Sequence, residues 1–367
     1  MKPIRVLQVL GGLNRGGAET MIMNLYRAMD KSKVQFDFII HNDNENAYVD
    51  EIKALGGEVY VFPKFTLKNS CSYKKHWNEF LDKHREYKIL HSHVRSYAIV
   101  FIRIAKSYGL KTIVHSHSTS NGSGIKARIK GLLQLSLRKE CDYLFACSKI
   151  SGEWLFGKKA VNSPNYRMIK NAIDTDKYKV DSSIRNEYRR SFNAEDKTIY
   201  GHIGRLSEPK NHRFLLEVFN DIIKKDHNSL LIIVGEGSYR LQIELWIREL
   251  HLEESVIMTG SRSDIPQLLS AMDVFLFPSL WEGLPVTVVE AQAAGLPSII
   301  SDRVTSEVAV SEAVTYLPID QGAECWVDCA LRSIGKRFNV IENIKTAGFD
   351  VSSSAMELAE FYRSIYA

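Results

Sequence analysis

Short apolar runs alternate with helix-length amphipathic segments from one end of the chain to the other. In the first half, the predicted strands are 4–10, 34–40, 58–62, 88–91, 111–116 and 142–147. The second half restarts the pattern, with predicted strands at 197–203, 229–234, 255–259, 273–277 and 297–301. Helices are predicted between the strands, among them 18–29 and 96–107. Nearly continuous apolar strands separated by helices indicate parallel sheets that helices cover on both faces.

Two such series predict an α/β protein with two doubly wound, Rossmann-like domains. We expect the first domain over residues 1–173 and the second over 174–352, because the polar stretch 171–196 shows no strand pattern. Ligands of doubly wound sheets bind beyond the carboxyl ends of the strands. The functional residues are therefore expected directly after strands, in a cleft between the two domains.

Composition supports a globular protein of this size. The chain has 367 residues, of which 45% are hydrophobic and 25% charged, and it contains no apolar run long enough to cross a membrane. The first residues enter a strand pattern directly and predict no secretory signal. Five scattered cysteines form no C-x-x-C pair, which predicts buried thiols in a reducing compartment and a cytoplasmic location.

The net charge of +5 is unevenly distributed. Residues 1–173 contain 28 Lys and Arg against 14 Asp and Glu, whereas the rest of the chain contains 20 against 29. The basic half suggests an anionic partner, for which nucleic acid, an anionic membrane and a lipid-linked phosphate are all candidates. Residues 124–140 form a basic amphipathic pattern. This segment is either a membrane-surface helix or a core helix with a solvated basic face.

Two motifs of the first half follow predicted strands. The stretch "GGLNRGGAET" (11–20) contains Gly16 and Gly17 just before a helix, and it is either a flexible turn or a loop whose amides meet a phosphate. The stretch "HSHS" (115–118) places His115 and His117 on one face of a strand. His117 lies nearer the strand's end and is the candidate site residue. For His115, and for His91 and His93 one strand earlier, structural roles are favoured, and no metal site is predicted.

In the second half, cations and acids follow strands. Arg205 comes after the first predicted strand and Lys210 opens the next helix. They are either two solvated surface cations or, as their place after a strand favours, a pair suited to bind a diphosphate. The stretch "PSLWEGLPVTVVEAQAAG" places Glu282, Gly283 and Leu284 in a loop at the mouth of a helix. Glu290 lies within that helix among apolar neighbours, where a buried carboxylate facing a ligand is suited to accept hydrogen bonds from ribose hydroxyls. The alternative, a helix-capping Glu282 and a surface Glu290, is disfavoured by these apolar surroundings.

In this order and spacing, the motifs resemble those of the retaining glycosyltransferases of family 4, which have the GT-B architecture. The resemblance runs over almost the whole chain: "GGAE", "HSHS", "KNAID", "GRLSEPKN", "IVGEGS", and the pair of glutamates eight positions apart, Glu282 and Glu290. Within the family, the sequence looks most like bacterial enzymes that build exopolysaccharide or capsule. It departs from the family's common motifs at "EPKN" and "KNAID", in which other members frequently have a glycine.

The resemblance implies a role for each candidate residue. Arg205 and Lys210 would bind the donor diphosphate together with Gly16, Gly17 and the amides of Gly283 and Leu284. His117 and Glu282 would be catalytic, facing the reacting sugar, and Glu290 would bind the ribose. The C-terminal helix, about 353–367, would pack back on the first domain.

The activity implied is retaining transfer of a hexosyl or N-acetylhexosaminyl group from a nucleotide-sugar, expected to be UDP-linked, with no metal required. The acceptor would be a glycan or a polyprenyl-diphosphate-linked oligosaccharide in surface polysaccharide biosynthesis, at the inner face of the membrane. The "DTD" at 174–176 looks like a metal-binding motif but is interpreted as a decoy. Two alternatives stay open: a UDP-sugar 2-epimerase on the same fold, and a nucleic-acid-binding protein, which no interleaved aromatic and basic motif supports.

Overall fold

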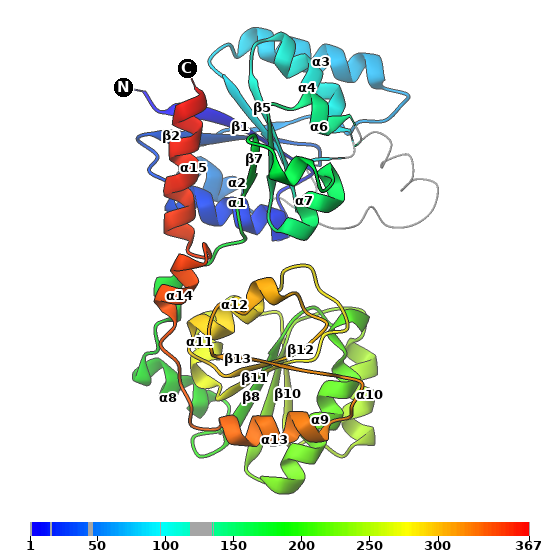
Figure 1. Ribbon diagram of the computed structural model, residues 1–367, viewed down its shortest axis with the longest axis vertical. Coiled ribbons are helices and arrows are strands. Elements are labelled where there is room, and N and C mark those ends of the chain that lie inside the picture. Colours follow the sequence, from blue (N-terminus) through cyan, green and yellow to red (C-terminus); the bar gives the residue numbers. More distant parts are fainter. Residues whose placement is uncertain are drawn as a thin grey trace. The chain divides into compact units, whose positions relative to one another are not determined.

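The computed structural model describes residues 2–14, 17–42, 47–95, 97–117, 134 and 136–366 (Figure 1). The chain divides into two compact units, Met1–Ala172 with Asp350–Ala367, and Ile173–Phe349. Each unit is built on one sheet whose strand pairs are all parallel. The predicted fold class, α/β with two doubly wound Rossmann-like units, is confirmed.

The first unit contains a seven-stranded sheet in the order β3-β2-β1-β4-β5-β6-β7. The strands are β1 (Ile4–Leu10), β2 (Val34–Ile40), β3 (Val59–Val61), β4 (Ile89–Ser92), β5 (Lys111–Ser116), β6 (Tyr143–Ala146) and β7 (Tyr166–Met168). The helices are α1 (Gly17–Ala28), α2 (Val49–Ala54), α3 (Ser70–Lys83), α4 (Ala98–Ser107), α6 (Leu137–Glu140), α7 (Lys149–Phe156) and α15 (Val351–Ile365), with the short η1 (Ala160–Asn162). The strand order reverses between β1 and β4.

The second unit contains a six-stranded sheet in the order β10-β9-β8-β11-β12-β13. Its strands are β8 (Thr198–Ile203), β9 (Ser229–Val234), β10 (Val256–Gly260), β11 (Val274–Phe277), β12 (Ser298–Ser301) and β13 (Val314–Leu317). Its helices are α8 (Ser182–Ser191), α9 (His212–Lys225), α10 (Arg240–Glu249), α11 (Ile265–Ala271), α12 (Val286–Ala293), α13 (Glu324–Ser333) and α14 (Ile341–Thr346). The short helices are η2 (Thr175–Tyr178), η3 (Glu208–Lys210) and η4 (Ser306–Val308). Here the order reverses between β8 and β11.

The strands are buried because helices cover both faces of each sheet. Every residue of β2 and of β9 is buried. The sequence of β9 is apolar after Ser229, as expected of a strand covered on both faces, whereas β2 also buries Gln35 and Asp37. Helix α15 belongs to the first unit, where it packs against α1 and β1 (Figure 1). It begins at Asp350, whose carboxylate accepts a hydrogen bond from the Ser353 amide at 2.9 Å. Its Tyr362 is fully buried.

Two strands and three cysteines differ from expectation. The edge strands β7 and β13 were not predicted, because they are short and only partly buried and so lack a continuous apolar run. The prediction that the thiols are buried holds for Cys141 and Cys147, but Cys71 on α3 is exposed, and Cys325 and Cys329 on α13 are only partly buried. In the described part of the chain, no helix is long and apolar enough to cross a membrane.

Candidate functional site

The reversal point of the second sheet brings several predicted residues to one edge. Strands β8 and β11 are neighbours, so the segments that follow them leave the same edge of the sheet, where doubly wound proteins bind ligands. Gly204 and Arg205 follow β8, and Pro278 follows β11. The amide of Leu280 donates a hydrogen bond to the carbonyl of Pro209 at 2.8 Å. The two loops are therefore fastened to each other.

Lys210 and Glu282 meet between these loops. Lys210 Nζ lies 2.7 Å from Glu282 Oε1, and the two side chains are only 13% and 16% exposed. The two groups form an ion pair, although their geometry is not that of a hydrogen bond. Lys210 Nζ also lies 4.4 Å from the centroid of the Phe277 ring. A largely buried cation is thus held at the edge of the sheet, where an anionic ligand would compete with Glu282 for it.

Arg205 presents a second cation at this edge. Its side chain is exposed, and within the part of the chain that the structure describes no acidic group pairs with it. An exposed guanidinium is free to form bidentate hydrogen bonds to phosphate oxygens. The turn that follows contains Asn211 with φ of 54°. Asparagine adopts this left-handed conformation more readily than most residues. The turn is therefore retained although Asn211 stands at the position of "EPKN" where the family often has glycine.

Glycines let the β9–α10 loop lie directly against the β8–η3 loop. The amide of Gly204 donates to the carbonyl of Val234 at 3.0 Å, and that of Leu206 to the carbonyl of Glu236 at 3.0 Å. A Cβ on Gly235 would lie 1.9 Å from the Gly204 carbonyl oxygen, and one on Gly237 would lie 2.2 Å from that of Leu206. The "VGEGS" sequence therefore fixes the backbone that presents Arg205.

Replacing Gly235 with alanine should lower the free energy of unfolding by about 3 kcal/mol, through overpacking and through strain at a φ of 144°. It should also weaken ligand binding at Arg205. Urea denaturation checks the first effect. Gly11→Ala is the matched control, because a Cβ there meets no atom within 4 Å. Equal stabilities of the two variants would show that the loops are not in this close contact.

The first turn of α12 offers backbone donors beside the ion pair. The helix begins after Pro285, which cannot cap it with a side chain, so its first amides are available to an anion. Gly283 is exposed, and a Cβ on it would meet nothing within 4 Å. Leu284 is partly buried and packs against the apolar core of the second unit. Gly283 thus lies open to a ligand, whereas the Leu284 side chain anchors the loop.

Glu290 lies on α12 and bonds to a residue far away in sequence. The Tyr178 hydroxyl donates a hydrogen bond to Glu290 Oε1 at 2.7 Å. Burial raises the pKa of the Glu290 carboxyl above its ordinary value, and the bond from Tyr178 opposes that shift. The other carboxylate oxygen has no hydrogen-bond partner among the described residues and is suited to accept one from a ligand hydroxyl. Glu290 therefore holds a position compatible with the role that the resemblance implies.

The two aspartates of "DTD" are each neutralised by a lysine. Asp174 lies 3.2 Å from Lys177, and Asp176 lies 2.7 Å from Lys179. Both pairs occur within or beside η2, a single turn of helix. The pairs give both acids a local structural role, and the interpretation of this motif as a decoy stays a prediction.

In the first unit, Gly17 is the first residue of α1 and is exposed, while Gly16 lies outside the described residues. His117 directly follows β5, and its Nε2 lies 2.8 Å from Nδ1 of His93. Burial, together with the nearby Arg95 cation, lowers the pKa of His117 to about 3. The ring is therefore neutral at physiological pH and, if it faces a sugar, acts as a hydrogen-bonding group rather than as a cation.

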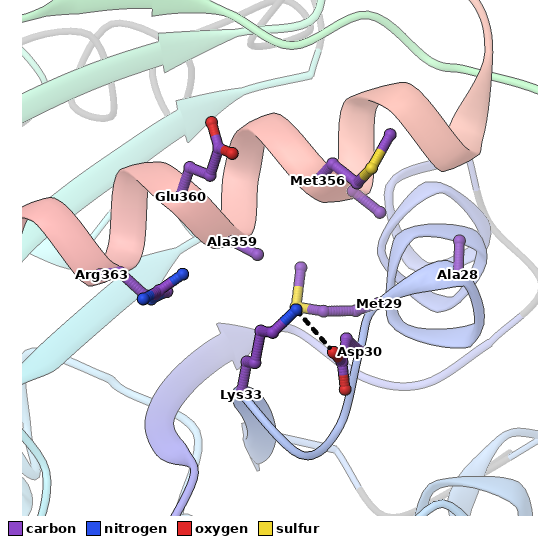
Figure 2. A pocket seen from close by; sticks show the side chains of 9 residues that line it. Ala28, Met29, Asp30, Lys33, Met356, Ala359, Glu360 and Arg363 are labelled. Atoms are coloured by element: carbon purple, nitrogen blue, oxygen red, sulfur yellow. Dashed lines mark ion pairs between the residues drawn. The ribbon is translucent and has the colours of Figure 1, made fainter.

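Two other features carry no predicted site residue. The basic segment 124–140 lies outside the described residues except for Gln134 and 136–140, so its predicted helix is not described further. A cavity of about 290 Å³ lies between α15 and the end of α1 with the turn that follows it. Figure 2 shows its lining residues and the ion pair of Lys33 with Asp30, whose charged atoms lie 3.0 Å apart. None of the residues that line this cavity belongs to the predicted site.

Sequence reasoning missed three parts of the site. It did not predict that Tyr178 would bond to Glu290, that Phe277 would lie under Lys210, or that Lys210 would pair with Glu282. The first contact joins residues 112 positions apart, which no local pattern reveals. For Phe277, the end of the "VFLF" strand was the available signal, because its last residue had to face the same edge as Lys210.

Known families match both halves of the chain. Residues 15–177 match the family described as "Glycosyltransferase Family 4", and residues 184–326 match "Glycosyl transferases group 1". EpsF of Bacillus subtilis (strain 168), named as a glycosyltransferase, is 34% identical over 98% of this chain and 96% of its own length. The UDP-Gal:alpha-D-GlcNAc-diphosphoundecaprenol alpha-1,3-galactosyltransferase of Escherichia coli is 28% identical over 60% of this chain and 59% of its own.

A solved structure shares the whole fold. The crystal structure of Anabaena Alr3699/HepE in complex with UDP and glucose aligns with a TM-score of 0.78 at 19% identity. The alignment covers 98% of this chain and 100% of that one. At this level of identity, the likeness establishes the shared architecture.

Proposed function

Because the chain belongs to glycosyltransferase family 4, we propose that it transfers a hexosyl or N-acetylhexosaminyl group from a UDP-sugar with retention of anomeric configuration. The observation that carries the proposal is the buried Lys210 cation beside exposed Arg205 and the uncapped start of α12, all at one edge of the second sheet. This arrangement matches the needs of a nucleoside diphosphate. The UDP bound by HepE supports uracil as the nucleobase of the donor. The family resemblance supports retention of the anomeric configuration.

The proposed chemistry depends on stabilising a leaving group. When the bond between the anomeric carbon and the diphosphate breaks, negative charge grows on the diphosphate and positive charge on the sugar ring. Lys210, Arg205 and the amides near Gly283 stabilise the first charge from fixed positions, which is how preorganised sites lower barriers. Glu282, released from Lys210 by the incoming phosphates, is proposed to contact the sugar, with His117 as a neutral hydrogen-bonding partner.

The proposed transfer requires no metal at the diphosphate, because Lys210 and Arg205 supply the positive charge that a divalent cation supplies elsewhere. EDTA should therefore leave the rate unchanged within about twofold, and Mn²⁺ should not stimulate it. A coupled assay of UDP release measures both effects. Loss of turnover in EDTA with recovery in Mn²⁺ would contradict this part of the proposal.

The proposed acceptor is a glycan or a polyprenyl-diphosphate-linked oligosaccharide in surface polysaccharide biosynthesis. The Escherichia coli relative acts on a diphosphoundecaprenol-linked sugar by its name, and the excess of Lys and Arg in residues 1–173 suits an anionic acceptor and membrane. The proposed location is the cytoplasm, peripherally on the inner face of the membrane. Flotation with vesicles that differ only in anionic lipid tests this, and equal binding to neutral vesicles would oppose it.

The product decides between transfer and the epimerase alternative. Incubation with a panel of UDP-α-hexoses and a lipid-linked acceptor should yield an α-linked product, identified from its anomeric coupling by NMR. The same donors without acceptor should yield no epimer. A β-linked product would overturn retention, and accumulation of an epimerised UDP-sugar would overturn transfer as the activity.

A further inference from the structure

Four histidines from the carboxyl ends of β4 and β5 form one cluster in the first unit. His91, His93, His115 and His117 stack on one another, with ring centroids 4.0 Å apart for His115 and His117 and 4.6 Å apart for His91 and His93. One ring nitrogen from each of His91, His93 and His115 lies within 4.8 Å of the others. We call these four residues the histidine cluster.

The histidine cluster contains ring nitrogens without partners. His91 and His115 are each only 1% exposed. Among the described residues, neither nitrogen of His115 has a hydrogen-bond partner, nor does Nε2 of His91. A buried polar atom left unpaired costs about 1–3 kcal/mol, and such atoms are uncommon in folded proteins. Together with Nδ1 of His117, four ring nitrogens of the cluster lack partners among the described residues. Since each neutral imidazole carries one N–H and one lone pair, the cluster contains lone pairs that no donor satisfies, which suits a metal cation.

The hydrogen bonds behind the cluster leave a lone pair free on His93 and allow a second one on His91. Nε2 of His93 donates to Oε1 of Gln8 at 3.0 Å, which leaves Nδ1 of His93 unprotonated. The Tyr362 hydroxyl oxygen lies 3.3 Å from the Gln8 amide nitrogen and 2.6 Å from Nδ1 of His91. If both nitrogens donate to it, Nε2 of His91 is also unprotonated. Outer partners of this kind fix the tautomers of metal-binding histidines.

We propose that the histidine cluster binds one divalent transition-metal cation of the zinc class, through Nε2 of His91, Nδ1 of His93 and one ring nitrogen of His115. Imidazole nitrogen suits zinc, cobalt, nickel and copper, whereas magnesium and manganese prefer oxygen. Ligand nitrogens in a tetrahedral zinc site lie about 3.3 Å apart, so binding draws the three rings closer together. The partly exposed His93 and His117 provide the entry side.

This site is separate from the chemistry proposed for the donor. Without a metal, Nδ1 of His93 lies 2.8 Å from Nε2 of His117. A bound cation would be coordinated by Nδ1 of His93 and would replace this contact. His117 then either loses its partner or becomes the fourth ligand. Arg95, the cation near His117, has its guanidinium carbon Cζ over the face of the Trp154 ring, 5.1 Å from the ring centroid. The proposal thus concerns a cation that changes the surroundings of His117, not one that holds the diphosphate.

Titration of the chelator-treated full-length protein with Co²⁺ tests the proposal without an activity assay. We expect one Co²⁺ per chain, with the visible absorption bands of a four-coordinate nitrogen site, and displacement by Zn²⁺. His93→Gln should abolish binding. Tyr362→Phe keeps all ligands but removes the outer oxygen, and it should weaken binding about 10- to 100-fold. His227→Ala removes an exposed imidazole of the second unit and should bind as the wild type does.

Three outcomes would overturn the proposal: no Co²⁺ bound by the wild type, binding by His93→Gln at wild-type affinity, or sulfur-to-metal charge-transfer bands that assign the ion to cysteine. If circular dichroism shows that His93→Gln does not fold, Tyr362→Phe decides, because it loses only a hydroxyl. Unchanged affinity in that variant would then contradict the site.

Discussion

Replacing Lys210 with alanine should lower kcat/KM for sugar transfer by about 100- to 1000-fold, the usual cost of removing one preorganised group that stabilises developing charge. Lys210 is held in place by Glu282 at 2.7 Å and by the Phe277 ring. Gly204 leaves room for it, since a Cβ there would lie 2.8 Å from Lys210 Cε. Steady-state kinetics with a saturating acceptor measure the loss, which should appear in kcat as well as in KM.

Two variants separate this catalytic effect from a loss of stability. Without Lys210, Glu282 is left as a largely buried carboxylate with no cation, which destabilises the fold. Adding Glu282→Gln to Lys210→Ala should therefore recover the melting temperature but not the activity. Lys224→Ala is the matched control, because Lys224 also pairs with an acid, Asp221 at 2.7 Å, on the exposed side of α9. A comparable rate loss in Lys224→Ala would mean that the effect is not specific to the site.

Replacing Glu290 with glutamine should weaken UDP-sugar binding about 10- to 100-fold, because hydrogen bonds to a charged acceptor contribute about 1.5–3 kcal/mol. The variant keeps the shape of the side chain but loses the charge. Tyr178→Phe is the matched control, since it removes the hydroxyl that donates to Oε1 and leaves the carboxylate. It should change affinity by less than about fivefold. Isothermal titration calorimetry measures both variants, and equal losses would refute a direct role for Glu290.

The pH dependence of binding follows from the same carboxyl. Burial raises the pKa of Glu290, and only the ionised form accepts hydrogen bonds with both oxygens. As pH falls from neutral toward that raised pKa, the affinity of the wild type for UDP-sugar should decrease. Glu290→Gln has no such group and should lack this decrease. Identical pH profiles for the two proteins would assign the titration to another residue.

The repeated strands and helices could be predicted because burial on both faces of a parallel sheet requires long apolar runs. The same logic located Arg205, Lys210 and Glu282 after strands, without showing how they would meet. The ion pair of Lys210 and Glu282 depends on the β8 and β11 loops being fastened at Leu280 and Pro209, a contact between segments that are distant in sequence. Strands β7 and β13 were missed for a related reason, because an edge strand needs fewer apolar residues.

The histidines show the same limit more strongly. The sequence places two pairs of histidines on neighbouring predicted strands, and each pair alone resembles an ordinary structural feature. Only the pairing of β4 with β5 stacks all four rings. Only the return of α15 brings Tyr362 to His91, across 271 positions. Local patterns predict which elements form, whereas the chemistry of this cluster arises from their arrangement.

Calorimetric titration of UDP into the full-length protein tests the central claim, that the edge of the second sheet at Arg205 and Lys210 holds a nucleoside diphosphate. The account predicts one UDP bound per chain by the wild type and by Lys224→Ala. It predicts affinity at least about tenfold weaker in Lys210→Ala and in Arg205→Ala, since each removes a charge-assisted contact. Absence of binding by the wild type, or equal binding by all four proteins, would contradict it.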